Sequence, residues 1–238
     1  MSSSEIARQS VRASAILLAG SLISNGILLI NALLVARLLG TNGYGTYSIS
    51  LLLPTIFLVA SGLGINTALT RFASYHRSRG EIEEAKRKTS NGIRFMIVLG
   101  TILTLCCYFS ASFVAKNFFQ RPMIVPLIQF ASLTILGQII FQSGVSSLVG
   151  WSMPKSAGAA YIIQAVVKIS LAPLLIVAGL GVLGPLTAQV TGILIAAIFA
   201  IVVLQPILRG TKSSNSFRVF YKDIREAIKF GFPSEIGG

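Results

Sequence analysis

Residues 13–36 read ASAILLAGSLISNGILLINALLVA, and this stretch decides the fold of the chain. It contains no charged residue, and it is long enough for an α-helix to cross the hydrocarbon core of a bilayer, which takes roughly 20 residues. The apolar region of a secretory signal peptide is shorter, about 7–15 residues. We therefore interpret residues 13–36 as a retained membrane-spanning helix.

Five more apolar stretches of similar length follow, and we expect them to form spans at residues 46–69, 95–115, 124–149, 157–179 and 185–208. The composition agrees, because 53% of the 238 residues are hydrophobic and 11% are charged. Soluble domains carry about 25% charged residues, so a soluble globular domain is excluded, as is a disordered chain. The predicted fold class is an all-α integral membrane protein, with a six-transmembrane-helix bundle over residues 1–208.

The positive charges predict how this bundle is oriented. Of the 20 Lys and Arg residues, three lie in segments on one side of the predicted spans and 16 lie on the other side, in residues 1–12, 70–94, 150–156 and 209–229. Loops rich in Lys and Arg stay in the cytoplasm, so we expect a cytoplasmic amino terminus. We expect no nucleic-acid partner, because the charges are divided among short segments and do not form one face of a folded domain.

Residue types for other chemistry are scarce. Cys106 and Cys107 are adjacent within one predicted span, and His76 is the only histidine, in a basic loop without a partner. None of the seven acidic residues lies within a predicted span, whereas proton- and cation-coupled carriers generally use a carboxylate inside the membrane. We therefore expect no metal, no cofactor and no enzymatic activity.

Two predicted cytoplasmic segments have helical patterns of their own. In residues 71–94, three glutamates precede three basic residues at spacings of three and four, which predicts a short surface helix. Residues 209–229 have the pattern of a basic amphipathic helix that lies on membrane lipids as a linker. Residues 230–238 turn apolar again, and we interpret them as the truncated start of a seventh span.

Each predicted span carries one seam of polar side chains. The amide side chains that we select as candidate binding residues are Asn25, Asn31, Asn66, Gln138, Gln142 and Gln164. Small and amide residues commonly mediate helix packing in membranes, and they also line water-filled cavities. The sequence leaves both interpretations open.

Lys168 is the one charged residue in the middle of a predicted span. Burying a lysine there costs at least about 2.5–3.5 kcal/mol, and no predicted span offers a carboxylate to pair with it. Either its ammonium faces a hydrated cavity that an anionic ligand visits, or a group from a second bundle pairs with it. Arg37 ends the first predicted span, where it serves either as an interfacial anchor or as a second cationic group of the site.

Three patches resemble a known family. Residues 36–47 read ARLLGTNGYGTY, residues 62–72 read GLGINTALTRF, and residues 228–233 read IKFGFP. They resemble the first-span exit, the second span and the seventh-span entry of the polysaccharide-biosynthesis flippases, which translocate lipid-linked oligosaccharides of the O-antigen type. This family shares the MATE-like (MOP) superfamily with the multidrug and toxin extruders.

The resemblance implies the amino-terminal half of a two-bundle plasma-membrane carrier that works by alternating access. A second six-helix bundle would complete it, either as the missing carboxyl-terminal half or as another chain. The expected cargo is a polyprenyl-pyrophosphate oligosaccharide for cell-surface polysaccharide biosynthesis, with Lys168 and Arg37 attracting the pyrophosphate and the amides contacting sugar hydroxyls. The alternatives are a MATE-like exporter of drugs or organic cations, a membrane-embedded glycosyltransferase, and an assembly subunit that transports nothing.

Overall fold

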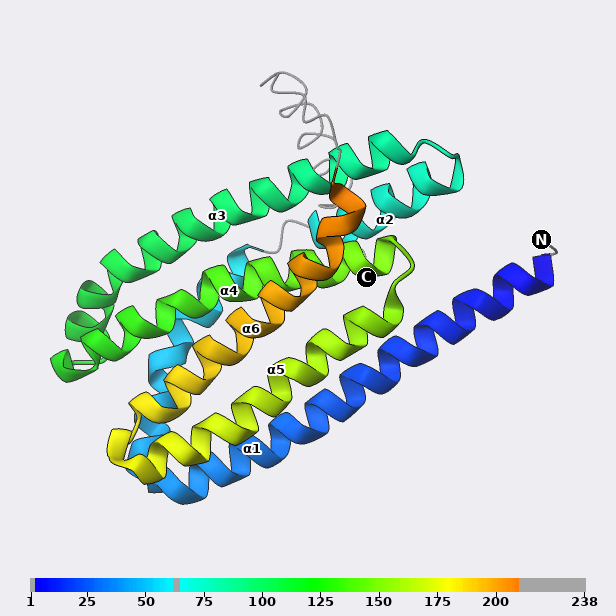
Figure 1. The fold of residues 1–238 in the computed structure, drawn as a ribbon. Helices are drawn as coiled ribbons and strands as arrows, with labels where there is room; N and C mark the ends of the chain where they lie inside the picture. Colours follow the sequence, from blue (N-terminus) through cyan, green and yellow to red (C-terminus); the bar gives the residue numbers. More distant parts are fainter. Residues whose placement is uncertain (1–2, 62–64, 210–238) are drawn as a thin grey trace.

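The computed structural model describes residues 3–61 and 65–209, and the side chains of residues 14–59, 61 and 66–209. The described chain is helical and contains no strand (Figure 1). The elements are α1 (Ser3–Ala60), α2 (Ile65–Ser78), α3 (Ile82–Asn117), η1 (Pro122–Ile124), α4 (Val125–Gly150), α5 (Pro154–Leu175), η2 (Ile176–Leu180) and α6 (Leu183–Leu208). Five of these helical segments are long and apolar enough to cross a membrane, so the chain is a multi-pass membrane protein.

Helix α1 is two helical segments that meet at Gly40. This residue has φ 66° and ψ 179°, outside the helical region, in a conformation that is essentially restricted to glycine. Figure 1 shows the chain reversing its direction there. The first two predicted spans therefore belong to one bent element, and the structure has five long apolar segments where the sequence predicted six separate ones.

The predicted second span, residues 46–69, is not one helix. Helix α1 ends at Ala60, and α2 begins at Ile65. The sequence between them, Ser61-Gly-Leu-Gly64, contains two glycines, and glycine is the weakest helix former after proline. The average hydropathy of this region concealed the break.

The prediction of a separate short helix within residues 71–94 was also wrong. Residues 71–78 belong to α2, and the glutamates and lysines that follow form the first turns of α3, which continues to Asn117. The turn between the two helices has Gly80 at φ 77°, with Gly80 N donating to Arg77 O and Glu81 N donating to His76 O. This pair of bonds is the glycine-terminated Schellman motif.

The expected charge pairs within this segment are present. Lys86 lies 3.0 Å from Glu83, and Arg87 lies 3.2 Å from Glu84. The predicted spacing was therefore right, but the helix that it stabilises extends into the bundle.

The turns divide the lysines and arginines between the two ends of the bundle. One end carries the α2–α3 turn, the α4–α5 loop and Arg209, and we call it the basic end. The opposite end carries the Gly40 bend and the α3–α4 and α5–α6 connections, with Arg37, Lys116 and Arg121 (Figure 1). At the basic end, Arg77 donates to Ser152 Oγ, and Trp151 Nε1 donates to Thr89 Oγ1 over 3.3 Å. These bonds connect the α2–α3 hairpin to the α4–α5 loop.

Helices α1, α5, α6, α4 and α3 lie side by side in this order (Figure 1). Small residues allow the close contacts. A Cβ on Gly137 of α4 would lie 2.8 Å from Ile193 of α6, and one on Gly144 would lie 2.9 Å from Ala200. This use of glycine and alanine is typical of helix packing in membranes.

The predicted spans 124–149, 157–179 and 185–208 correspond in position to α4, to α5 with η2, and to α6. The predicted linker at residues 209–229, apart from Arg209, and the predicted seventh span at residues 230–238 lie outside the described residues.

Candidate functional site

The contacts between α1 and α5 fix the depth at which their polar residues lie. A Cβ on Gly20 would lie 2.8 Å from Gly158 Cα, and Ser24 Oγ donates to Tyr161 O over 3.0 Å. Val35 and Ala172 belong to one buried cluster. All three pairs are separated by 137 or 138 positions, so the two helices are parallel and in constant register. The same register places Asn31 level with Lys168.

Lys168 packs against α6. A Cβ on Gly192 would lie 2.8 Å from Lys168 Cγ and 3.1 Å from the carbonyl oxygen of Gln164. The aliphatic stem of Lys168 therefore lies over a position that only glycine leaves open. The side chain is half-buried, and its ammonium makes no hydrogen bond or ion pair with the described part of the chain.

Helix α4 adds an amide about one helical turn from this level. The rings of Phe141 and Tyr161 meet edge to face, with centroids 5.2 Å apart, and α4 and α5 run in opposite directions (Figure 1). Moving one turn along each helix brings Gln138 level with Gln164. We call Asn31, Gln138, Gln164 and Lys168 the central polar layer.

Two members of this layer are deeply buried. Gln164 is 7% exposed and Asn31 is 6% exposed. Asn31 Oδ1 is also buried and has no hydrogen-bond partner among the described residues, although buried polar atoms are nearly always bonded. The central polar layer thus contains a cationic group and, at the same level on α1, an acceptor without a partner, and no acidic residue of the described helices lies at this depth.

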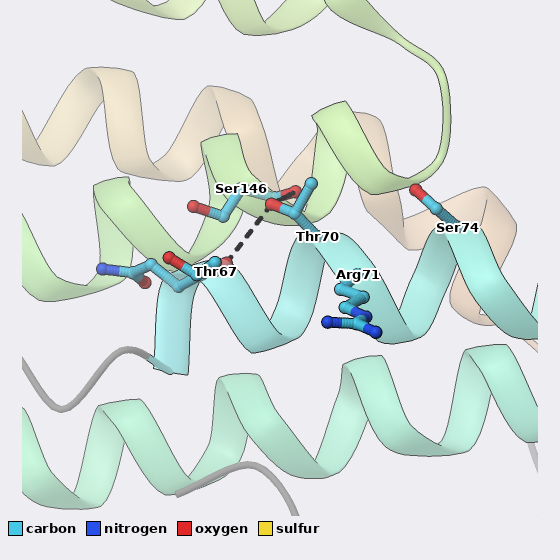
Figure 2. Close-up of a pocket in the computed structure, with 6 residues that line it drawn as sticks. Thr67, Thr70, Arg71, Ser74 and Ser146 are labelled. Carbon is cyan, nitrogen blue, oxygen red and sulfur yellow. Dashed lines mark hydrogen bonds between the residues drawn. The ribbon is translucent and has the colours of Figure 1, made fainter. Parts of the chain in front are cut away.

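A second group of polar residues lies between α2 and α4, toward the basic end. Thr70 Oγ1 donates to Ser146 O over 2.9 Å, and Ser74 Oγ donates to Gly150 O over 3.2 Å. Both pairs are separated by 76 positions, so the same register places Asn66 level with Gln142. A pocket of about 350 Å³ opens here, and we call it the α2–α4 pocket; its lining residues are Asn66, Thr67, Thr70, Arg71, Ser74 and Ser146 (Figure 2).

The polar seam of α4 connects the two groups. Gln138, Gln142 and Ser146 follow one another at intervals of four residues, a rise of about 6 Å for each step. Gln138 is in the central polar layer, Gln142 is level with Asn66, and Ser146 lines the α2–α4 pocket. The seam therefore leads from the pocket at the basic end to the middle of the bundle.

Two of the predicted residues stand apart. Asn25 is exposed on a face of α1 that it shares with Leu22 and Leu29, which are 68% and 64% exposed. Arg37 is exposed near the Gly40 bend, six residues beyond Asn31. The structure does not bring either of them into the central polar layer.

The α2–α4 pocket was not predicted as a site from the sequence. Arg71 was counted only as an orienting charge, and Thr67, Thr70 and Ser74 were not considered. The signal was present, because residues 66, 70 and 74 repeat at intervals of four and mark one polar face of a helix. It was missed because α2 was not recognised as a helix with its own beginning at Ile65.

The expectation that His76 has no partner was wrong. His76 is 8% exposed, and its Nδ1 lies 2.6 Å from Glu81 Oε2 across the α2–α3 turn. One ligand atom each from His76, Glu81 and Glu84 lies within 4.8 Å of the others, a spacing that could hold a metal ion. Glu84, however, also lies 3.2 Å from Arg87 and 4.0 Å from Lys88, so the geometry is that of an ion-pair network that fastens the hairpin.

Comparison with known proteins establishes the family. A family model described as "Polysaccharide biosynthesis protein" matches residues 10–237. The chain belongs to this family, as the resemblance of its sequence patches predicted. No curated protein matches the chain.

Solved structures with the same fold include MATE and MOP-superfamily transporters. A crystal structure of MATE in complex with MaD5 has a TM-score of 0.78 at 18% identity, and the match covers 95% of this chain and 52% of the MATE chain. A MOP-superfamily transporter from Pyrococcus furiosus Vc1 has a TM-score of 0.76 at 18% identity, with coverages of 96% and 52%. An outward-facing multidrug-resistance MATE-family transporter of the MOP superfamily has a TM-score of 0.74 at 20% identity, with coverages of 96% and 52%.

The chain spans about half the length of these structures. Its fold is therefore that of a MATE-like half-transporter. The structures that share this fold are transporters, and the expectation that the chain is not an enzyme stays a prediction.

Proposed function

We propose that this chain is the amino-terminal half of a plasma-membrane flippase that translocates a lipid-linked oligosaccharide for cell-surface polysaccharide biosynthesis. The observation that carries the proposal is the central polar layer, in which Lys168 and three amides lie within about one helical turn of one another, without a carboxylate. A cationic, acid-free layer suits an anionic headgroup. The amides can bond sugar hydroxyls, because each offers a donor and an acceptor.

A second six-helix bundle would complete the carrier. The chain covers about half of the length of its structural relatives. In addition, α1 leaves most of its apolar surface uncovered by the described helices, because only 17% of its most apolar stretch is buried. Transporters built from two parallel repeats bind their cargo near the bilayer midplane, where the repeats meet. In this arrangement Lys168 faces a hydrated space and attracts the pyrophosphate.

The second candidate is a MATE-like exporter of drugs or organic cations, which the shared fold favours. The polarity of the site opposes it, because a lysine without a nearby carboxylate repels cations. A comparable distinction is drawn for the Pyrococcus furiosus transporter, for which the reverse polarity of the binding pocket suggests a different function.

A transport assay with two cargoes separates the candidates. The complete native polypeptide is reconstituted in vesicles and offered either a fluorescent polyprenyl-diphosphate saccharide or a fluorescent organic cation. We expect the saccharide lipid to exchange between leaflets and the cation to stay on its original side. Transport of the cation alone would favour the exporter, and transport of neither would favour a non-transporting assembly subunit.

A further inference from the structure

We propose that the α2–α4 pocket is a separate binding site for a phosphate group that carries hydroxyl groups, and that this site loads cargo from the basic end. The inference rests on the proposed function for the identity of the cargo. It adds a site about two helical turns from the central polar layer, built from residues other than Lys168.

The walls of the pocket are fixed by bonds between two helices. The hydroxyls of Thr70 and Ser74 donate to the main-chain carbonyls of Ser146 and Gly150 on α4. Close packing adds to this fixation, since a Cβ on Gly150 would lie 2.7 Å from the Cβ of Ala73. A pocket held in this way is formed before a ligand arrives, which reduces the entropy lost on binding.

Inside these walls, several polar groups remain available. The Thr67 and Ser146 hydroxyls make no hydrogen bond with the described residues. Asn66 Oδ1 is buried and has no hydrogen-bond partner in the described chain. A buried acceptor without a donor is costly, so this oxygen favours a ligand that brings a hydroxyl.

Arg71 supplies the charge that selects the ligand. Its side chain is exposed and lines the pocket (Figure 2). A guanidinium binds phosphate with two parallel hydrogen bonds, and none of the lining residues is acidic. The pocket therefore combines an arginine, hydroxyl groups and an amide oxygen that can accept a hydrogen bond from a ligand hydroxyl. This combination favours a phosphorylated polyol and disfavours an organic cation.

The size of the pocket limits what it holds. Its volume of about 350 Å³ lies at the lower end of ligand pockets, which range over about 300–1,000 Å³. The pocket accommodates a phosphate with one adjoining sugar, and the rest of a longer oligosaccharide would extend beyond its open side. Gln142, level with Asn66, is the next polar side chain on the seam toward Gln138.

A binding experiment with a short-chain prenyl-diphosphate monosaccharide tests the site. The complete native polypeptide is placed in phosphatidylcholine nanodiscs, and the Kd of the probe is measured for the wild type, Asn66→Asp and Arg71→Ala. We expect Kd to rise about tenfold or more in both variants, because each removes or opposes a charge-assisted contact. Asn66→Asp preserves the size of the side chain but places a carboxylate at a buried atom, so the thermal unfolding of the variant is measured alongside its Kd to separate an effect of charge from a loss of folding.

Arg79→Ala is the matched control for Arg71→Ala. Arg79 is also exposed at the basic end, but it lies over the ring of Tyr75 and does not line the pocket. We expect its Kd to equal that of the wild type. Equal Kd values for Asn66→Asp and the wild type, or an equal loss in Arg79→Ala and Arg71→Ala, would overturn the proposal.

Two competition arms identify the source of the phosphate. If phosphatidylglycerol in the nanodiscs displaces the probe from the wild type but not from Asn66→Asp, a membrane phospholipid also occupies the site. If unlabelled saccharide lipid displaces the probe and phosphatidylglycerol does not, the site is specific for cargo. Both results support the site, whereas displacement by inorganic phosphate alone would overturn the requirement for hydroxyl groups.

Repeating the titration in a Lys168→Ala background separates this inference from the proposed function. If Asn66→Asp weakens binding in both backgrounds but the wild type transports no saccharide lipid, the pocket stands and the flippase assignment fails. If transport depends on Lys168 but Asn66→Asp leaves the Kd of the probe unchanged, the flippase assignment stands and the α2–α4 pocket fails as a binding site.

Discussion

Gly192 determines whether Lys168 can occupy its position. Because a Cβ at this glycine would lie 3.1 Å from the main-chain oxygen of Gln164 and 2.8 Å from Lys168 Cγ, Gly192→Ala must separate α5 from α6 or displace the lysine. We expect a loss of about 1–3 kcal/mol in the free energy of unfolding, the usual cost of overpacking. Unfolding by denaturant in detergent measures it. Gly26→Ala is the control, since nothing lies within 4 Å of the added carbon; an equal loss there would contradict the packing described.

The structure separates the candidate residues that the sequence selected into different surroundings, and their role in binding stays a prediction. Hydropathy and helical spacing selected Lys168 and the amides of the central polar layer as candidates, because a charged or polar residue within an apolar run can be recognised from the sequence alone. They could not show that Asn25 and Asn31 point to different surroundings, the first exposed and the second buried against α5. That difference depends on which face of α1 meets its neighbour.

At the scale of elements, the bend at Gly40 tests the fold of α1. The backbone there, with φ 66° and ψ 179°, costs a residue with a side chain about 1–3 kcal/mol. We expect Gly40→Ala to lower the midpoint of thermal unfolding. Gly45→Ala should leave it unchanged or raise it, because Gly45 lies within the helix in open space and alanine favours helix by about 1 kcal/mol. Equal midpoints for the two variants would argue against a bend at residue 40.

The register of α1 and α5 is testable by cross-linking. In a chain without its two native cysteines, cysteines at positions 31 and 168 should be joined by a short bifunctional thiol reagent, because the two positions are level on adjacent helices. Cysteines at positions 25 and 168 should react much less, since position 25 is on the exposed face and more than one turn away. Similar yields for the two pairs, measured by mass spectrometry, would refute the register and with it the central polar layer.

The elements show why sequence patterns succeed and fail. Helices α4 and α6 begin and end within a few residues of two predicted spans, since their apolar runs coincide with the helices. Helix α3 is much longer than its apolar run, because its first turns are charged and are held by ion pairs at the basic end. Helix α2 was hidden, because apolar residues continue across the glycine-containing break before it. Hydropathy measures transfer into a membrane and does not locate the start of a helix.

At the scale of the whole molecule, the two ends of the bundle should face different compartments. The structure brings the basic segments at residues 71–94 and 152–155 to one end, as the loop charges predicted, and the side of the membrane remains a prediction. In a chain without native cysteines, Ser78→Cys should react with a membrane-impermeant maleimide only after the cell is opened. Asn117→Cys, exposed at the opposite end, should react in intact cells. The reverse pattern would place the amino terminus outside.

The central claim is that Lys168 draws an anionic lipid headgroup into the middle of the bundle. The most direct measurement is the rate at which a fluorescent polyprenyl-diphosphate saccharide crosses vesicles that contain the complete native polypeptide with Lys168→Arg or Lys168→Glu. We expect Lys168→Arg to retain most of the wild-type rate and Lys168→Glu to fall to the rate of empty vesicles, because the first keeps the positive charge and the second reverses it. A folded Lys168→Glu variant that flips the lipid at the wild-type rate would contradict the claim.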